Sequence, residues 1–374
     1  MMLSARISLE RGNTAEMESA IDRVLAREEP SADIYGMAAQ LFARAGHARA
    51  NDLTFAGVER FPTDERLIRL ARSRRAYLAP GPRDVVAVLG NCQAEMLCDL
   101  AAQVPALARR FRFVPVPTYA VPGKTMAAIS RDITSAVLLW DQYEMQPGTR
   151  ALRETLRATV PSTCRIVTYP PVGMLACWPF ASANRYSQPG PGFPWGPFPL
   201  GDRIANELIA QGVSRKDAVA RYLELSRAKM PDPRRLLERD RRLWDQAEEA
   251  CDVKIAEFEY DNFRTTRLFI SSRHPTNADA AELLARLCAA SEDALGIDTS
   301  LVRLQLSAVL PDTPEHAAVS VPLHPDVIER LGIEYCDSTT RYAWFGNAWT
   351  FEEYIERYIA RDTDWQARGW GATA

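Results

Sequence analysis

The segment DVVAVLGNCQAEMLCDL, residues 84–100, decides the fold. Its apolar run at 85–89 predicts a buried strand, Gly90 predicts a tight turn, and a helix is predicted to begin at residues 91–93. A polar triplet that contains a thiol therefore follows a hydrophobic strand. In an open α/β sheet, ligands bind at the carboxyl ends of the strands, where the helix amino termini converge.

Cys92 is the candidate nucleophile in this segment. A thiol in the first turn of a helix faces unpaired backbone N–H groups and the positive end of the helix dipole, and both favour the thiolate. The same N–H groups can stabilise an oxyanion, while Gly90 allows a sharp turn and leaves room for a substrate. The alternative is a small buried hydrophobe, since most intracellular cysteines are of that kind. We expect that structural role for Cys98, Cys164, Cys177, Cys251 and Cys288.

Length and composition limit the class of protein. With 374 residues, the chain exceeds an average domain, which predicts a main domain with an appendage or two domains. A formal net charge of -3 gives no basic footprint for nucleic acid. Seven cysteines without CxxC pairs indicate a reducing compartment and no zinc site. Without a long apolar run there is no secretory signal or membrane span, so we expect a soluble, cytoplasmic protein.

The amino-terminal region, residues 13–78, is predicted to be helical throughout. Asn13, Ser31 and Thr63 are candidate helix starts, and the spacing of small residues loosely matches tetratricopeptide (TPR) units. Two repeats are too few for a free-standing solenoid, so we expect these helices to dock on the main domain or on a partner chain. A Pro/Gly linker follows, which predicts a TPR-like helical extension over 1–79 and an α/β domain over 80–374.

Strands alternate with helices along the second region. Apolar runs at 111–117, 136–140 and 164–168 follow the first strand, with helical segments between them. This alternation predicts a mostly parallel sheet covered by helices, with polar residues such as Gln142 at the strand ends. An aromatic, Pro/Gly-rich segment at 180–202 predicts an ordered lid or binding loop. A helical insertion over about 200–250 and a carboxyl-terminal helix complete the α/β domain.

His274 is the candidate base for Cys92, because a thiolate nucleophile needs a base within hydrogen-bond reach. It follows a strand predicted at 267–271, and Pro275 holds it extended before the next helix. The alternative is a loop histidine that caps that helix. His324 also precedes a proline at a helix start and is the second candidate.

Several motifs occur in the order found in the WcbI-like family of polysaccharide biosynthesis proteins, which the chain resembles over residues 84–360. They are GNCQ at 90–93, the strand ending at Gln142, DVKI at 252–255, RLF at 267–269 followed by HPTN, and PLHPDVIERLGI at 322–333. Each short motif is weak alone, whereas the ordered set is fairly specific. The helical amino terminus lies outside the resemblance.

The resemblance implies a coenzyme-A-binding acyltransferase, an O-acetyltransferase that uses acetyl-CoA and no metal to modify a capsular or other surface polysaccharide. It also implies a flavodoxin-like core similar to that of SGNH hydrolases, with Cys92 where those enzymes have serine and His274 as the late histidine. Ser272 stands where that pattern has an aspartate, so the third triad member stays open, with Asp261 and Asp279 as candidates.

The implied chemistry assigns roles to the other site residues. Cys92 either attacks the thioester or only helps to bind the coenzyme while His274 deprotonates the acceptor. Backbone N–H groups and Asn91 would stabilise the oxyanion, and Gln93, Gln142 and His324 would contact the substrate. Three cations are candidates for the CoA phosphates, with surface charge as the alternative for each: Lys124, Arg131 and Arg185.

Two other functions fit the same residues. With water as the acceptor, the protein would be an SGNH-like esterase or deacetylase, because acceptor choice depends on how wet the pocket is. In the third alternative the α/β domain only binds CoA or a glycan, and the amino-terminal helices recruit a protein partner or a second copy of the chain. Neither alternative predicts nucleic-acid binding.

Overall fold

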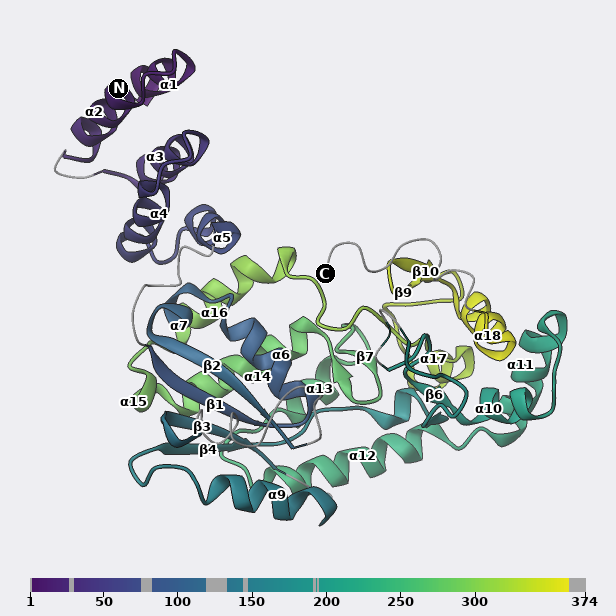
Figure 1. The fold of residues 1–374 in the computed structure, drawn as a ribbon. Coiled ribbons are helices and arrows are strands. Elements are labelled where there is room, and N and C mark those ends of the chain that lie inside the picture. The colour runs from purple at the N-terminus through teal and green to yellow at the C-terminus, as the bar shows by residue number, and fades with distance from the viewer. Residues whose placement is uncertain are drawn as a thin grey trace. The chain divides into compact units, whose positions relative to one another are not determined.

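A computed structural model describes residues 2–26, 30–74, 83–118, 133–143, 147–190, 193 and 195–362 (Figure 1). The chain divides into two compact units. The first comprises Met1–Tyr169, Cys251–Val253 and Ala280–Pro314, and the second comprises Pro170–Ala250, Lys254–Asp279 and Glu315–Ala374. The chain therefore crosses between the units several times, and neither unit is one continuous stretch.

A parallel sheet of four strands forms the centre of the first unit (Figure 1). Its strands are β1 (Asp84–Gly90), β2 (Phe111–Pro117), β3 (Ala136–Gln142) and β4 (Arg165–Tyr169), in the order β2-β1-β3-β4. The inner strands β1 and β3 are almost entirely buried, which explains their near-continuous apolar sequences. The predicted parallel α/β sheet is confirmed, and its strand order is that of the first four strands of flavodoxin-like sheets.

Helices cover both faces of this sheet. On one face, Leu89 and Leu139 pack with Leu156 of α9 (Pro147–Arg157). On the other face, the Trp140 Nε1–H donates to Ser291 Oγ at 3.0 Å, just beyond α14 (Asn277–Ala290). The buried Asp141 carboxylate at the end of β3 accepts two hydrogen bonds from Arg153 of α9, at 2.7 and 2.8 Å. Three shorter elements complete these layers: α6 (Cys92–Ala101), α7 (Pro105–Arg110) and α15 (Glu292–Leu295).

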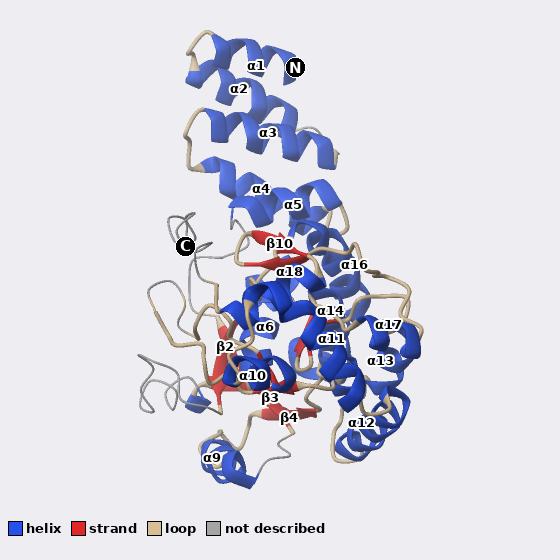
Figure 2. Ribbon diagram, turned by 90° about the vertical axis from the view of Figure 1, so that its right-hand side faces the viewer, coloured by secondary structure: helices blue, strands red, loops and turns tan. Residues whose placement is uncertain are grey.

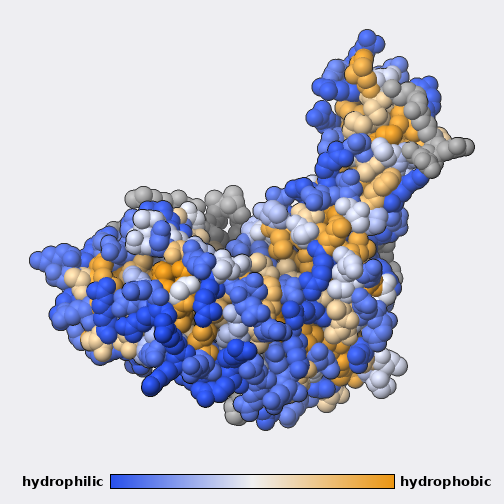
Figure 3. Space-filling view, turned by 180° about the vertical axis from the view of Figure 1, so that it is seen from behind, coloured by the Kyte–Doolittle hydropathy of each residue, from blue (hydrophilic) through white to orange (hydrophobic). Residues whose placement is uncertain are grey.

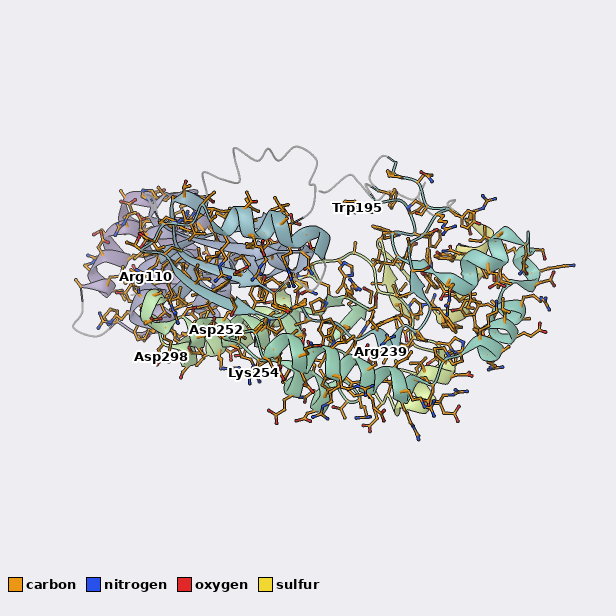
Figure 4. The ribbon with its side chains drawn as sticks, turned by 90° about the horizontal axis from the view of Figure 1, so that it is seen from below. Arg110, Trp195, Arg239, Asp252, Lys254 and Asp298 are labelled. Carbon is orange, nitrogen blue, oxygen red and sulfur yellow. The ribbon has the colours of Figure 1, made fainter. Side chains whose placement is uncertain are left out.

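Asp252 explains part of the DVKI motif. Its Oδ2 accepts hydrogen bonds from the backbone N–H and the hydroxyl of Thr168, both at 2.7 Å (Figure 4 labels Asp252). In return, the N–H groups of Asp252 and Val253 donate to the Thr168 carbonyl at 3.1 Å. These bonds from Thr168 lower the pKa of the Asp252 carboxyl and hold residues 251–253 beside β4.

The amino-terminal helices form two packed pairs followed by a single helix (Figure 2). They are α1 (Met2–Glu10), α2 (Thr14–Leu25), α3 (Ala32–Arg44), α4 (Arg49–Arg60) and α5 (Glu65–Arg74). Asn13 caps α2 as predicted, by accepting from the Glu16 N–H at 3.1 Å. The predicted start of the last helix at Thr63 is wrong by one residue, because Asp64 accepts from the N–H groups at its start. Helix α1 was not predicted, since its residues lack a long apolar run.

Helix α5 docks on the helices that flank the sheet, which is one of the two outcomes predicted for this region. Ile68 packs against Ala308 and Val309 of α16 (Thr299–Val309), which continues into η3 (Leu310–Asp312). Arg72 donates to the Gln103 side chain at 2.8 Å and to the Asp312 carbonyl at 2.6 Å. The docking therefore combines an apolar contact with hydrogen bonds from the Arg72 guanidinium to backbone carbonyls that have no partner within the helix.

The second unit is built around aromatic side chains. Trp344 and Tyr354 lie 4.9 Å apart between ring centroids, and Phe198 from the predicted loop at 180–202 packs against both. That loop is closed by antiparallel pairing of β5 (Ala181–Ser182) with β6 (Gly201–Asp202), so within its described residues it is ordered as predicted. The other elements are η1 (Leu175–Cys177), α10 (Arg203–Ala210), η2 (Arg215–Asp217), α11 (Ala218–Lys229), α12 (Pro233–Glu248), α13 (Ala256–Asn262), α17 (Pro325–Leu331), β9 (Tyr342–Trp344), β10 (Asn347–Trp349) and α18 (Phe351–Ala360).

The strand before His274 differs from the prediction. It is β7 (Phe269–Ser271), and it pairs antiparallel with β8 (His274–Pro275) instead of joining the parallel sheet. Its chain folds back at once through Ser272 and Arg273, and Ile270 also accepts a bond from the Val321 N–H at 2.8 Å. The strand's hydrogen bonds are thus made within the second unit. The strand predicted before His274 therefore does not pair with the four-stranded sheet, and the role of His274 as the base stays a prediction.

Hydrophilic residues cover much of the face drawn in Figure 3, with apolar residues showing between them. None of the described helices is long and apolar enough to cross a membrane. The helical segment predicted between the strands at 111–117 and 136–140 lies outside the described residues up to residue 132.

Candidate active site

The turn after β1 has the predicted form. Asn91 is the amino-terminal cap of α6, and its side-chain oxygen accepts from the Gln93 N–H at 2.9 Å. Cys92 is the first residue of the helix. On the other side of the turn, the Thr118 N–H donates to the Gly90 carbonyl at 2.9 Å. A thiol and open helix N–H groups therefore lie together at the carboxyl end of a central strand.

Gln142, at the end of β3, holds this turn in place. Its Oε1 accepts from the Asn91 N–H at 2.9 Å, and its Nε2 donates to Gln93 Oε1 at 2.8 Å. Both glutamine side chains are buried. Their described contacts fix the backbone beside Cys92, and the role that we predicted for these two amides, orienting the substrate, stays a prediction. Gln142 and Gln93 thus hold the turn that carries the thiol.

Gly90 is required because of close packing. A Cβ atom there would lie 2.7 Å from Gln142 Oε1 and 3.0 Å from the Tyr169 hydroxyl oxygen. The φ angle of Gly90 is not in the left-handed region, so the turn itself does not need glycine. The space that we expected a substrate to use is filled by Gln142 and Tyr169.

Tyr169 is a residue of this site that we did not predict. It ends β4, is fully buried, and its hydroxyl has no hydrogen-bond partner among the described residues. Burial raises the pKa of Tyr169 well above its ordinary value, and nearby Cys98 and Asp141 act in the same direction. The Tyr169 hydroxyl, which lies next to Gly90, therefore stays protonated. The only sequence signal was its position directly after an apolar strand.

Burial also controls the Cys92 thiol. It raises the pKa of Cys92, and the negative charge of Glu95 in the same turn adds to this effect. The N–H groups of Cys92 and Gln93 act in the opposite direction but do not outweigh burial. We expected the helix start to favour the thiolate overall, and that expectation is wrong because the sulfur is only partly accessible to water.

His274 has a serine as its partner. Its Nδ1 lies 2.7 Å from the Ser271 hydroxyl oxygen, and Nε2 has no partner among the described residues. Burial lowers the pKa of His274, and His316 and Arg273 lower it further, so the imidazole is neutral near pH 7. When Nδ1–H donates to Ser271, Nε2 is able to accept a proton. Neither Asp261 nor Asp279 is among its described partners, and Asp261 is exposed.

Both ring nitrogens of His324 are occupied. Nδ1 accepts from the Asp326 N–H at 3.1 Å and caps α17, so Nε2 carries the proton, which it donates to Ser226 Oγ at 2.9 Å. The Ser226 hydroxyl in turn donates to the Leu223 carbonyl at 3.2 Å. Burial lowers the pKa of His324 to about 4, so the ring is neutral. His324 was our second candidate for the base, but neither of its ring nitrogens is open to accept a proton from a substrate. Its ring still lines a cavity.

That cavity lies within the second unit and has a volume of about 320 Å³. Residues 271–273, directly before His274, form part of its wall, as does His324. Apolar and aromatic side chains form most of the rest. This composition is typical of small-molecule sites, which are mostly apolar with a few placed polar groups.

The predicted cation set is only partly described. Lys124 and Arg131 lie outside the described residues. Arg185 is exposed in the loop at 180–202, as is Trp195 (Figure 4), and Arg185 is not among the residues that line the cavity. Within the described ranges, no group of His, Cys, Asp and Glu side chains is arranged to hold a metal ion.

The site residues fall into two sets. Cys92 and its network, with Asn91, Gln93 and Gln142, belong to the first unit, whereas His274 and the cavity belong to the second. The structure brings together the residues of each set. That Cys92 and His274 act on one substrate stays a prediction.

An open parallel sheet with a capped thiol at its carboxyl edge defines an α/β protein whose ligand site is expected at the strand ends. A family model described as "Polysaccharide biosynthesis enzyme WcbI" matches residues 85–295, more than half of the chain. The chain therefore belongs to the WcbI family of polysaccharide biosynthesis enzymes, which confirms the resemblance seen in its motifs.

A solved structure has a similar fold. It is described as WcbI, a novel polysaccharide biosynthesis enzyme, as the native protein without a disulfide bond between coenzyme A and one of its cysteines. The two chains are 18% identical with a TM-score of 0.58, and the match covers 77% of this chain and 94% of that one. The comparison with curated proteins gave no match.

Replacing Gly90 with alanine is expected to destabilise the first unit, because the new methyl group must displace Gln142 and Tyr169. Overpacking of this kind costs about 1–3 kcal/mol, which lowers the melting temperature by several degrees. Gly36→Ala is the matched control, because a Cβ atom at Gly36 would meet only Leu67 Cδ2, at an ordinary contact distance of 3.7 Å. Gly36 lies inside α3, where alanine stabilises the helix relative to glycine. Equal melting temperatures of Gly90→Ala and the wild type, measured by circular dichroism, would contradict this packing.

The Cys92 thiol is expected to react slowly with iodoacetamide at neutral pH. Because its pKa is raised, the alkylation rate should reach half its maximum above the value of about 8.5 found for an exposed thiol. Glu95→Gln should move that midpoint to lower pH, whereas Asp99→Asn, at an exposed position of the same helix, should leave it in place. Tandem mass spectrometry of the Cys92 peptide follows the rate, and a midpoint unaffected by Glu95→Gln would count against the charge effect.

Proposed function

We propose that the protein is an O-acetyltransferase that moves an acetyl group from acetyl-CoA to a sugar hydroxyl of a capsular or other surface polysaccharide. The observation that carries the proposal is the position of Cys92, the first residue of α6 at the carboxyl end of β1, in a member of this family. The related WcbI structure is described by reference to a disulfide bond between coenzyme A and a cysteine. That description supports contact between the coenzyme thiol and Cys92 here.

Two routes fit the described residues. In the covalent route, the Cys92 sulfur attacks the thioester carbonyl carbon, the bond to the coenzyme sulfur breaks, and coenzyme A leaves and takes a proton. The sugar hydroxyl then gives its proton to His274 and attacks the carbonyl carbon of the acetyl-cysteine. The bond to the Cys92 sulfur breaks, and that sulfur takes the proton from His274. In the direct route, the sugar hydroxyl gives its proton to His274 and attacks acetyl-CoA itself, the bond to the coenzyme sulfur breaks, and coenzyme A leaves with that proton. Cys92 then only contacts the coenzyme. In both, the α6 N–H groups and the Asn91 amide would stabilise the oxyanion.

The raised pKa of Cys92 limits the covalent route. Near pH 7 the sulfur is a thiol, so a base must take its proton before or during attack. His274 is neutral and has Nε2 open among the described residues, which suits it to this task or to the acceptor proton. The same neutral imidazole thus serves either route.

Further parts of the proposal rest on the resemblance. The core would correspond to that of SGNH hydrolases with cysteine in place of serine, and the TPR-like helices α1–α5 would offer a surface to a protein partner or to a second copy. Lys124, Arg131 and Arg185 would pair with the phosphates of coenzyme A.

Radiolabelled acetyl-CoA separates the two routes. In the covalent route, label accumulates on Cys92 in the absence of sugar, and Cys92→Ala abolishes both the label and the transfer. In the direct route, the wild-type protein acquires no label, and Cys92→Ala only weakens the binding of the coenzyme. His274→Asn should lower transfer by about 10²–10⁴-fold in both cases. Full transfer by a Cys92→Ala, His274→Ala variant would contradict the proposal, and acetate release at an equal rate without sugar would indicate an esterase.

The pH profile tests His274 and its partner. Because burial lowers the pKa of His274, kcat should fall on acidification with a midpoint below about 6.5, the value for an exposed histidine. Ser271→Ala removes the partner of Nδ1 and should lower kcat while leaving the KM for acetyl-CoA unchanged, and Ser271→Thr should restore kcat. Equal loss with both substitutions would show that Ser271 only fills space.

A further inference from the structure

The cavity of the second unit has the chemistry of a site for a single sugar ring. Its volume of about 320 Å³ lies near the lower end of small-molecule sites, which span about 300–1,000 Å³. A polymer strand or an intact nucleotide sugar needs a longer groove. The described walls come from separate parts of the unit, including β5, β6, α11 and α18, which gives the cavity a fixed outline.

The walls present broad aromatic and aliphatic surfaces. Trp178, Phe180, Phe351 and Tyr354 are all buried and line the cavity. A pyranose ring has two faces of C–H groups and a rim of hydroxyls, so its faces suit aromatic walls and its rim needs polar partners. Such a ring matches a cavity that is mostly apolar with polar groups at a few points.

Asp202 supplies a fixed hydrogen-bond acceptor. One carboxylate oxygen accepts from the Ala205 N–H at 2.8 Å, and the other accepts from the Tyr222 hydroxyl at 2.7 Å. These two bonds set the orientation of the carboxylate and leave lone pairs on each oxygen. No ion pair joins Asp202 to arginine or lysine within the described part of the chain, although burial raises the pKa of Asp202 to about 6 and the charge of Arg203 lowers it. A carboxylate held in this way accepts hydrogen bonds from hydroxyl groups, and Arg273 adds one cation to the same lining.

The cavity also adjoins the candidate base. Ser271 lines it, and the same side chain lies 2.7 Å from His274 Nδ1. Ser272 and Arg273, which connect the two residues along the chain, line it as well. A hydroxyl group of a ring in this cavity would thus lie near the residues that hold His274.

We propose that this cavity is the acceptor site, in which a single neutral sugar ring stacks on aromatic walls and donates hydroxyl hydrogen bonds to Asp202. The inference rests on the proposed function, because it names the acceptor of that reaction. It assigns Asp202 as a substrate-binding residue and places the acceptor, and not the coenzyme, within the second unit.

Saturation-transfer NMR with methyl glycosides of mannose, glucose, galactose and N-acetylglucosamine tests the site on the full chain. At least one glycoside should bind the wild type. Asp202→Asn, which keeps the shape of the side chain, should weaken that binding about tenfold, as expected for a lost hydrogen bond to a charged group. Binding by none of the four, or equal binding by Asp202→Asn, would overturn the proposal.

A blocking substitution provides a second readout that does not depend on Asp202. Ser182 is exposed and lines the cavity, so Ser182→Phe should abolish glycoside binding without disturbing the core. Ala183→Phe, at the next exposed position outside the lining, is the matched control and should bind like the wild type. Loss of coenzyme A binding in Ser182→Phe, measured by calorimetry, would instead assign the cavity to the pantetheine arm and overturn the proposal.

The acceptor proposal and the proposed function fail in different ways. If glycosides bind in the cavity but are never acetylated, the proposed function fails and the sugar site stands. If sugars are acetylated while Ser182→Phe leaves both binding and transfer unchanged, the reaction stands and the cavity is not its acceptor site.

Discussion

The hydrogen bonds of Gln142 are the constraint on which the first unit's site depends. One buried amide accepts from the N–H of Asn91 and donates to the side chain of Gln93, so the end of β3 fixes the backbone on both sides of Cys92. An amide has both a donor and an acceptor, which is why a single residue can hold a cap and a helix turn together. Gly90 follows from this arrangement, since any side chain there would occupy the place of Gln142. The position of the thiol is therefore set by neighbouring strands and only secondarily by the helix that carries it.

Burial and helix geometry act against each other at Cys92. The start of α6 offers N–H groups to the sulfur, which favours the thiolate. The packing around this turn also excludes water from the sulfur, and this burial raises the pKa of the thiol. His274 follows the same principle with the opposite sign, because burial lowers the pKa of a base that is charged when protonated. The two candidate groups are therefore both neutral near pH 7. A neutral thiol and a neutral imidazole suit a reaction in which the thiol proton moves to the imidazole while the sulfur forms its new bond. They suit less well a reaction that starts from a thiolate–imidazolium ion pair.

Local sequence patterns predicted the elements of the sheet well. The apolar runs before Gly90 and Gln142 indicated strands, and the Asn91 cap was legible because cap and helix lie within a few residues. The larger failures concern contacts that the pattern of a single strand or helix does not show. Nothing near the RLF motif indicates that β7 pairs with β8 and not with the sheet, and the direction of the Cys92 pKa depends on packing that no short window contains. Ser271, three residues before His274, was missed because the expected partner of a catalytic histidine was a carboxylate.

The serine partner of His274 has a chemical consequence. A carboxylate beside Nδ1 stabilises the imidazolium and raises the pKa of the base, whereas a hydroxyl fixes the tautomer with little gain for the charged form. The described surroundings of His274 add positive charge from Arg273 and no carboxylate partner, so its protonated form is disfavoured twice, by burial and by repulsion. Such a base releases its proton readily. That property would suit the proposed acyl transfer, because a departing coenzyme thiolate needs a proton and a weakly basic imidazole gives it up without a large barrier.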